Sequence, residues 1–160
     1  MLALMGVPGI YFHSLFGSRS DRAGAERANM PRRINREKLQ RADLERELAE
    51  PASLRARVFE RYGALLRVRR TQSAFHPHGG QQVISADERV FALLRLSPDG
   101  SARVLCLHNV SNQVARVRFE GAAWRGEWID LVSGARMRSS ADVLALELKP
   151  YQVVWARQRG

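Results

Sequence analysis

The spacing of apolar residues changes near Gly79, and this change limits what the chain can fold into more than any other feature of the sequence. Before it, five apolar side chains recur at helical spacing and predict a helix with one apolar stripe. The stripe consists of Leu54, Val58, Tyr62, Leu65 and Leu66. After it, short apolar runs are separated by turn residues, which is typical of β-strands. We therefore expect two parts, one over residues 1–78 and a β domain over residues 79–160.

The β part opens with a predicted hairpin. Two apolar runs, residues 90–94 and 103–110, flank Ser97-Pro98-Asp99-Gly100, whose residue types favour a turn. Apolar and polar residues then alternate over residues 114–119, as in a half-buried strand. Further short strands are expected at residues 128–132, 144–148 and 152–155. A series of short strands with turn signals predicts a small antiparallel β-sandwich.

The first 17 residues contain no Asp, Glu, Lys or Arg, which invites a membrane or signal-peptide interpretation. A spanning helix needs about 20 mainly apolar residues, and this stretch is shorter and interrupted by Pro8 and Gly9. A signal peptide begins with positive charge, which is absent here. We instead expect residues 1–5 to end a helix and residues 7–12 to form a short buried strand. A chain that opens in this way is expected to be part of a longer protein.

Residues 13–35 are rich in Gly, Ser and Arg, and they predict a long loop. Loops of this length in compact domains are uncommon and are usually functional or mobile. A helix is expected from Asn35, a suitable N-cap, to about Ala49. Pro51 then suits the first turn of the helix that carries the apolar stripe.

The chain has a formal net charge of +10, and nearly all of its basic residues are arginines. Acidic residues are interleaved with them, and no block of five or more like charges occurs. This pattern favours solvated basic surfaces over a nucleic-acid-binding tail. The single cysteine, Cys106, excludes an internal disulfide and a cysteine-based zinc site, and it is expected to be a small buried hydrophobe. It is compatible with a reducing compartment, and we expect a cytoplasmic location.

The residues alone reveal no complete catalytic constellation. His76 and His78 lack an acidic or cysteine partner nearby, so no metal site is expected. His108 is expected in a strand, as a core or edge histidine. Neither a phosphate-binding glycine loop nor a serine nucleophile elbow is present in the sequence.

One segment resembles a known family. Residues 6–19 are similar to the eighth barrel strand and following loop of the α-amylase superfamily, glycoside hydrolase family 13, in its branch of sucrose phosphorylases and glucosylglycerate phosphorylases. The branch pattern G-x-P-x-[IV]-Y is met by Gly6-Val7-Pro8-Gly9-Ile10-Tyr11. The branch ends the loop in Asn-Asp, whereas this chain has Ser20-Asp21. Later segments of the branch are resembled, in order, by residues 33–39, 57–62, 69–75, 105–111 and 148–153.

The resemblance implies the C-terminal remnant of a (β/α)8 barrel over residues 1–78, with its last strand, active-site loop and last helices. An antiparallel β-sandwich over residues 79–160 would follow it. It also implies retaining transfer of a glucosyl unit from sucrose or a related glucoside to phosphate, without a cofactor. The catalytic carboxylates of the family lie upstream of the eighth strand, so this chain holds no catalytic residue and is expected to be inactive alone.

The resemblance also implies a partial substrate site. Arg32 and Arg36 match the arginines of the family's Arg-x-Ile-Asn-Arg segment, one of which holds the outer hydroxyls of the glucosyl unit. Tyr11 and His13 lie where the strand would meet the active-site face. The remaining candidates, in the acceptor-side loop, are Arg19 and Asp21. Three of these side chains have a structural alternative: Arg32 and Arg36 as solvated charges, and Tyr11 as barrel packing.

The implied partners are the sugar substrate and inorganic phosphate, with no membrane and no nucleic acid. Self-association through exposed barrel surfaces is also expected. A second interpretation is a non-catalytic sugar-binding β module, in which Trp124, Trp128 and Trp155 form a stacking platform; at strand spacing they are more often core. A third is a basic nucleic-acid-binding protein, which would need an electropositive stripe on one face.

Overall fold

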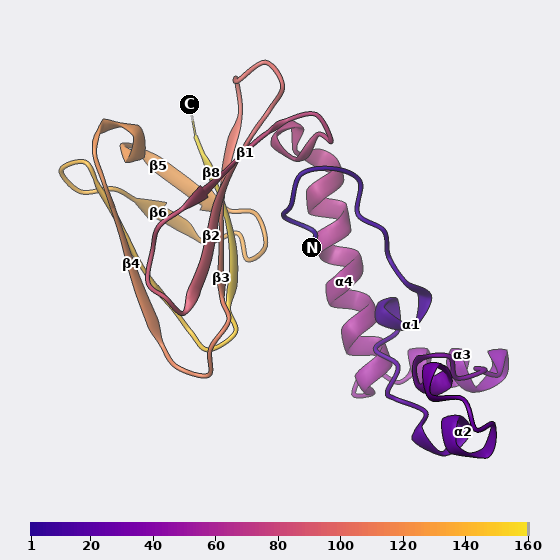
Figure 1. Ribbon diagram of the computed structural model, residues 1–160. Helices are drawn as coiled ribbons and strands as arrows, with labels where there is room; N and C mark the ends of the chain where they lie inside the picture. The colour runs from indigo at the N-terminus through magenta and orange to yellow at the C-terminus, as the bar shows by residue number, and fades with distance from the viewer. Residues whose placement is uncertain (160) are drawn as a thin grey trace. The chain divides into compact units, whose positions relative to one another are not determined.

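The computed structural model describes residues 1–159 and divides into two compact units. The first, here called the β unit, comprises Met1–Pro8 and the chain from Arg67 onward; the second, the helical unit, comprises Gly9–Leu66. Figure 1 shows the strands in one unit and the short helices in the other. The predicted assignment of residues 1–78 to a barrel and 79–160 to a separate domain stays a prediction. Among residues 1–159, no helix combines the length and the apolar character that crossing a bilayer requires.

The β unit is an antiparallel two-sheet structure. Its strands are β1 (Gly80–Ile84), β2 (Val90–Leu96), β3 (Arg103–Asn109), β4 (Ala115–Glu120), β5 (Glu127–Asp130), β6 (Arg136–Arg138), β7 (Val143–Leu148) and β8 (Val153–Gln158). Six strands form one sheet in the order β1-β2-β3-β8-β5-β6, and β4 pairs with β7 in a second sheet. Every pairing is antiparallel. The predicted antiparallel β-sandwich and its 97–100 turn are therefore confirmed.

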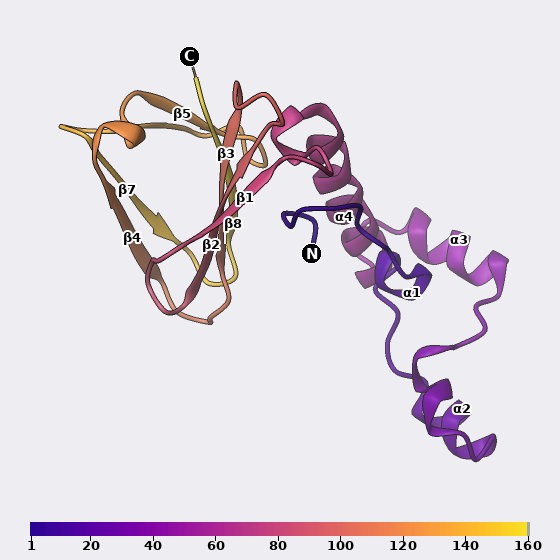
Figure 2. The same ribbon diagram turned by 45° about the horizontal axis from the view of Figure 1, so that its top comes forward.

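The main core lies between the two sheets, which face each other in Figures 1 and 2. On β4, Ala115, Val117 and Phe119 are buried while the residues between them are exposed, so the sequence alternation gives the inner and outer faces directly. Trp128 and Leu148 are fully buried in the same core. Burial of this apolar surface is the main force that holds the two sheets together.

The large sheet also buries its other face. Leu93, Cys106 and Trp155 are paired in register on β2, β3 and β8, and each is at most 1% exposed. Phe75, in the short 3-10 helix η2 (Ser73–Phe75), packs on Trp155 with ring centroids 4.7 Å apart. The central strands are therefore buried on both sides, which explains why they read as continuous apolar runs.

Two buried arginines tie the N-terminal segment to this second face. Arg69 donates to the carbonyl oxygens of Leu2, Leu4 and Gly6. Arg95, 0% exposed, donates to the carbonyls of Ala3, Gly80 and His76. Both guanidiniums also lie over the Phe75 ring, 5.5 and 5.8 Å from its centroid. Backbone carbonyls rather than carboxylates thus satisfy these charges.

The helical unit is built from short elements joined by turns. They are α1 (Phe12–Leu15), α2 (Arg22–Arg27), the 3-10 helix η1 (Pro31–Asn35), α3 (Arg41–Ala49) and the first part of α4 (Leu54–Thr71). The end of α4, from Arg67, belongs to the β unit. The predicted helix with the apolar stripe is therefore confirmed. Its stripe is only half-buried, and Leu54 is 46% exposed.

Several sequence predictions for the N-terminal half are wrong. Residues 7–11 have no regular structure, residues 12–15 are helical, and Val7 is 81% exposed, so the expected buried strand is absent. An isolated extended segment leaves its backbone donors and acceptors unpaired, and a strand forms only beside a partner. Residues 1–5 form a turn, closed by Leu4 N–H donating to the Met1 carbonyl, instead of the end of a helix.

The expected long loop and the start of the next helix also need correction. Residues 13–35 contain α2, η1 and most of α1 rather than one irregular loop. The helix expected from Asn35 begins at Arg41, because Asn35 closes η1 and the chain then runs without regular structure to Gln40. β1 and β6 were not expected, since one begins with Gly and two glutamines and the other spans three residues.

Candidate functional site

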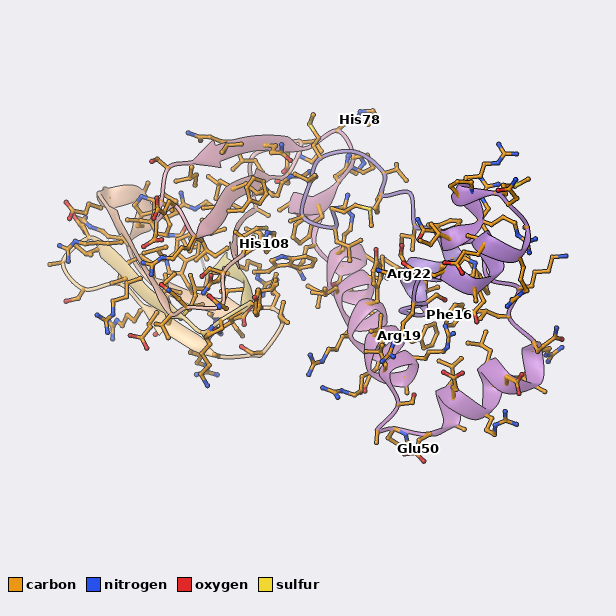
Figure 3. All side chains as sticks on the ribbon, turned by 60° about the horizontal axis from the view of Figure 1, so that its bottom comes forward. Phe16, Arg19, Arg22, Glu50, His78 and His108 are labelled. Carbon is orange, nitrogen blue, oxygen red and sulfur yellow. The ribbon has the colours of Figure 1, made fainter. Side chains whose placement is uncertain are left out.

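The helical unit contains a pocket of about 310 Å³. It is lined by Tyr11, His13, Ser14, Gly17, Ser18, Arg19 and Asn35. Three of the six predicted site residues, Tyr11, His13 and Arg19, are therefore brought together. Figure 3 shows Arg19, with Phe16 nearby in the same unit. We call this cavity the Tyr11–Asn35 pocket.

A glycine-terminated turn shapes the pocket wall. Gly17 follows α1 with φ +59°, a left-handed conformation that glycine adopts without strain. Its N–H donates to the Ser14 carbonyl, and the Ser18 N–H donates to the His13 carbonyl at 2.9 Å. This pair of bonds is the Schellman arrangement that closes helices. Gly17 also has no room for a side chain, since a Cβ would lie 2.9 Å from Cγ2 of Val58.

The same turn places two polar side chains in contact. Nδ1 of His13 and Oγ of Ser18 are 2.9 Å apart. The His13 ring also lies between aromatic neighbours, with centroid distances of 5.3 Å to Tyr11 and 5.5 Å to Phe12. A short helix closed by Gly17 therefore fixes the position of the histidine.

Arg55, from α4, donates hydrogen bonds to this turn. Its side chain is only 12% exposed, and its Nη1 donates to Ser18 Oγ at 2.8 Å and to the Phe16 carbonyl at 3.4 Å. Its Nε donates to Glu47 at 2.8 Å, and its Nη2 lies 3.5 Å from a Glu37 oxygen. The two carboxylates fix the orientation of the guanidinium against the turn.

Sequence reasoning missed Arg55 and Ser18. Arg55 falls on the polar side of the predicted helix, where a solvated charge is the default interpretation. Its partners in the turn lie 37 and 39 residues earlier in the chain, so no local spacing could have indicated them.

Asp21 has a structural role at the start of α2. Its carboxylate accepts from the Gly24 N–H at 2.8 Å, which is an N-cap. Its own N–H donates to the Ile34 carbonyl at 2.7 Å, so residues 21–34 form an excursion whose two ends meet. Asp21 does not line the pocket. Its predicted contact with phosphate or acceptor stays a prediction.

Arg32 and Arg36 lie near the pocket in sequence but do not line it. Arg32 is within η1, Arg36 follows its last residue, and both are exposed. The Tyr11 hydroxyl donates to the Asn35 carbonyl at 3.0 Å, which joins the pocket to the residue before Arg36. The predicted sugar contacts of both arginines stay predictions.

The pocket offers mainly hydrogen-bond donors. No carboxylate is among its lining residues, whereas Arg19 contributes a guanidinium and His13 an imidazole. Such a set suits the oxygens of a sugar or an anion. A retaining glycosyl transfer needs two carboxyl groups about 5–5.5 Å apart, and these lining residues do not supply them.

The strongly shifted side chains lie in the β unit instead. Burial lowers the pKa of His108 to about 4, with a smaller effect from the positive N-terminal amine. Burial also raises the pKa of the Cys106 thiol and lowers the pKa of the Arg69 and Arg95 guanidiniums. Cys106 is 0% exposed, so the prediction of a buried hydrophobe is confirmed. These groups belong to the packed sheet, and Figure 3 shows His108 within it.

The tryptophans do not form an exposed platform. Trp128 and Trp155 are 0% and 1% exposed, and Trp124 is half-buried against Trp128 at a centroid distance of 5.9 Å. The Trp128 indole donates to the Trp124 carbonyl. The three tryptophans therefore do not form the stacking platform considered for a sugar-binding module, since the rings of Trp128 and Trp155 belong to the core.

The β unit matches a known family model. Residues 81–155 match the model described as "Maltogenic Amylase, C-terminal domain". Solved structures show the same fold: an α-amylase from Anoxybacillus aligns with a TM-score of 0.62 at 12% identity, covering 79% of this chain and 25% of that one. AmyP, solved in complex with maltotriose, aligns with a TM-score of 0.57 at 16% identity, covering 64% of this chain and 21% of that one.

Curated relatives match nearly the whole chain. The glucosylglycerate phosphorylase of Spirochaeta thermophila is 44% identical over 97% of this chain, which covers 28% of the relative. The glucosylglycerate phosphorylases of Allomeiothermus silvanus and Escherichia coli are 40% and 33% identical, and the chain covers 25% and 26% of them. The chain thus spans about a quarter of the length of these relatives, at their C-terminal end.

Proposed function

Because the chain belongs to the α-amylase superfamily, we propose that it works as the C-terminal part of a glycoside phosphorylase. In such an enzyme a glucosyl unit passes from a glucoside to inorganic phosphate, giving glucose 1-phosphate and the free alcohol. The observation that carries the proposal is the 44% identity with a glucosylglycerate phosphorylase over 97% of the chain. We place this activity in the cytoplasm.

The proposed role of the helical unit is to bind substrate rather than to break the bond. Barrel enzymes take their catalytic groups from the ends of several strands, and the Tyr11–Asn35 pocket has no carboxylate in its lining. Its donors instead fit the oxygens of the glucosyl unit, the acceptor or phosphate. Arg32 and Arg36 would contribute from η1 and the residue after it, and Asp21 from the start of α2.

We propose glucosylglycerate as the donor, with sucrose as the alternative. The relatives are named for glucosylglycerate, whose glycerate part carries a carboxylate. A guanidinium such as that of Arg19 binds carboxylates and phosphates through aimed, charge-assisted hydrogen bonds. A neutral disaccharide makes less use of this charge.

The activity is tested by completing the enzyme. A chimera would join the N-terminal three quarters of the Escherichia coli glucosylglycerate phosphorylase to this chain in place of its own C-terminal quarter. We expect phosphate-dependent release of glucose 1-phosphate from glucosylglycerate, and none from the 160-residue chain alone. A folded chimera without activity, or turnover by the chain alone, would contradict the proposal. Sucrose serves as the second donor.

The arginine assignments are tested in the same chimera. Arg32→Ala and Arg36→Ala each remove a candidate charge-assisted bond to the sugar, worth about 1.5–3 kcal/mol. One of them is expected to lower kcat/KM by roughly ten- to a hundredfold, with little change in stability because both side chains are exposed. Arg27→Ala, at an exposed position of α2, is the matched control. Full activity in both variants would remove these arginines from the site.

The exposed apolar side chains of the helical unit fit the same proposal. Phe12, Leu54 and Phe59 are 50%, 46% and 42% exposed. Apolar surface of this kind marks an interaction face, which we assign to the rest of the barrel. The isolated chain is therefore expected to self-associate, which sedimentation velocity over a concentration series would detect. A monomer at all concentrations would contradict this expectation.

A further inference from the structure

We propose that Arg55 and Ser18 are positioning residues that hold the His13 ring in its Nε2–H tautomer. In this form His13 offers an N–H donor in the Tyr11–Asn35 pocket to an oxygen of the bound ligand. The nature of the ligand rests on the proposed function, whereas the tautomer rests on the contacts of the helical unit alone.

The first step is the orientation of Arg55. All three of its guanidinium nitrogens have partners: Nε bonds Glu47, Nη2 lies against Glu37, and Nη1 donates to Phe16 and Ser18. The side chain is 12% exposed, so the guanidinium has little freedom to turn away. Nη1 is thereby fixed as a hydrogen-bond donor to the Ser18 oxygen, at 2.8 Å.

The bond from Arg55 determines where the Ser18 hydroxyl donates its hydrogen. A hydroxyl has one hydrogen to donate and two lone pairs to accept with. Arg55 occupies one lone pair, and the other contact of Oγ within residues 1–159 is His13 Nδ1 at 2.9 Å. If Nδ1 also carried a hydrogen, the oxygen would face two donors and its own hydrogen would have no protein acceptor. The arrangement that satisfies every group has Ser18 donating to an unprotonated Nδ1.

The third step is the consequence for the ring. A neutral imidazole that accepts at Nδ1 carries its hydrogen on Nε2. A donation from Arg55 polarises the serine hydroxyl and strengthens the bond that it makes in turn. The Tyr11 hydroxyl is already used in its bond to the Asn35 carbonyl. His13 Nε2–H and the Arg19 guanidinium are therefore two of the donors that this pocket offers a ligand.

The backbone also brings Ser18 and His13 together. The Ser18 N–H donates to the His13 carbonyl at 2.9 Å, and Gly17 permits the left-handed turn that this bond requires. The turn thus sets the serine beside the histidine, and Arg55 decides which of the two donates.

The experiment is a nitrogen-15 NMR measurement on the 160-residue chain labelled at histidine, at a pH where imidazoles are neutral. His13→Gln assigns the His13 signals. Exposed His78, whose ring makes no contact with a carboxylate or hydroxyl among the described residues, is an internal reference. We expect the nitrogen-15 chemical shifts of the two ring nitrogens to differ more in His13 than in His78. The shifts should also identify Nε2 as the protonated nitrogen of His13.

Variants then identify the cause. Ser18→Ala removes the donor to Nδ1 while leaving both ion pairs of Arg55 in place, so the unit keeps its fold. The Ser18→Ala variant should reduce the chemical-shift difference between the His13 ring nitrogens toward the difference seen in His78. Arg55→Met should narrow it as well, Arg55→Lys should restore part of it, and Arg57→Met, at an exposed position of the same helix, should leave it unchanged.

Three results would overturn the proposal: a hydrogen on Nδ1 of His13 in the unmodified chain, a His13 chemical-shift difference equal to that of His78, or an unchanged difference in Ser18→Ala. An inactive chimera would count against the proposed phosphorylase function but would leave the tautomer measurement as it stands. The two proposals therefore fail separately.

Discussion

His108 gives the β unit a stability that depends on pH. It lies on β3, where its Nε2 accepts a hydrogen bond from the Trp155 indole at 3.2 Å and its ring stacks on Phe91 at 5.9 Å. If Nε2 of His108 were protonated, its N–H would face the indole N–H of Trp155 in a largely buried environment, and the hydrogen bond between them would be lost. Burial first, and the positive N-terminal amine second, lower the pKa from 6.5 to about 4.

The sign and size of the effect follow from linkage. Above pH 6.5 the histidine is neutral in both states and contributes nothing. Between pH 6.5 and about 4 the unfolded chain takes up a proton that the folded chain does not, so the stability falls as the pH falls. A difference of about 2.5 units corresponds to about 3.4 kcal/mol at 1.36 kcal/mol per unit. Because part of the ring meets solvent, screening reduces this, and we expect a loss of about 2 kcal/mol between pH 7 and pH 4.5.

The assay is urea unfolding followed by tryptophan fluorescence at these two pH values. The three tryptophans, Trp124, Trp128 and Trp155, all lie in the β unit, so the signal reports on that unit alone. His108→Gln keeps an acceptor for the indole but cannot titrate, and it should lose about 2 kcal/mol less than the parent over the interval. His78→Gln, at an exposed site, is the control. Equal losses in the parent and in His108→Gln would refute the reasoning.

Three further perturbations test the packing. Arg95→Met leaves three backbone carbonyls of a buried site without their donor, and it should lower the unfolding free energy by about 3 kcal/mol. Arg136→Met, at an exposed position, should lower it by less than about 0.5 kcal/mol. Equal urea midpoints for the two variants would disprove this. Because burial raises its pKa, the Cys106 thiol should react with a disulfide reagent at pH 8 only after unfolding, and rapid labelling of the folded chain would contradict its burial. Gly17→Ala combines a left-handed backbone with a Cβ 2.9 Å from Val58; it should destabilise the helical unit by about 1–3 kcal/mol, seen as faster amide exchange there, and unaltered exchange would be the opposing result.

The candidate site was partly predictable. Tyr11, His13 and Arg19 share one pocket, as the segment that resembles the eighth barrel strand and its loop suggested. The local backbone explains why these three residues lie together, because a helix of four residues and a glycine turn keep them close whatever surrounds them. Their contact with substrate stays a prediction. Arg55 was not predictable, since its contacts depend on how α4 packs against a turn formed nearly forty residues earlier.

In the fold, the sequence by itself determined the elements whose pattern is internal to them. The alternation of β4, the turn between β2 and β3, and the length of α4 need only the local order of polar, apolar and turn-forming residues.

The tertiary structure decided what depends on a partner. Residues 7–11 have a strand-like composition, but no neighbouring strand pairs with them, and they form no strand. The burial of Arg95 follows from three carbonyls that distant segments bring to it. Strand pairing and the burial of a charge both require groups far apart in the chain to meet, and no local pattern encodes which groups will do so.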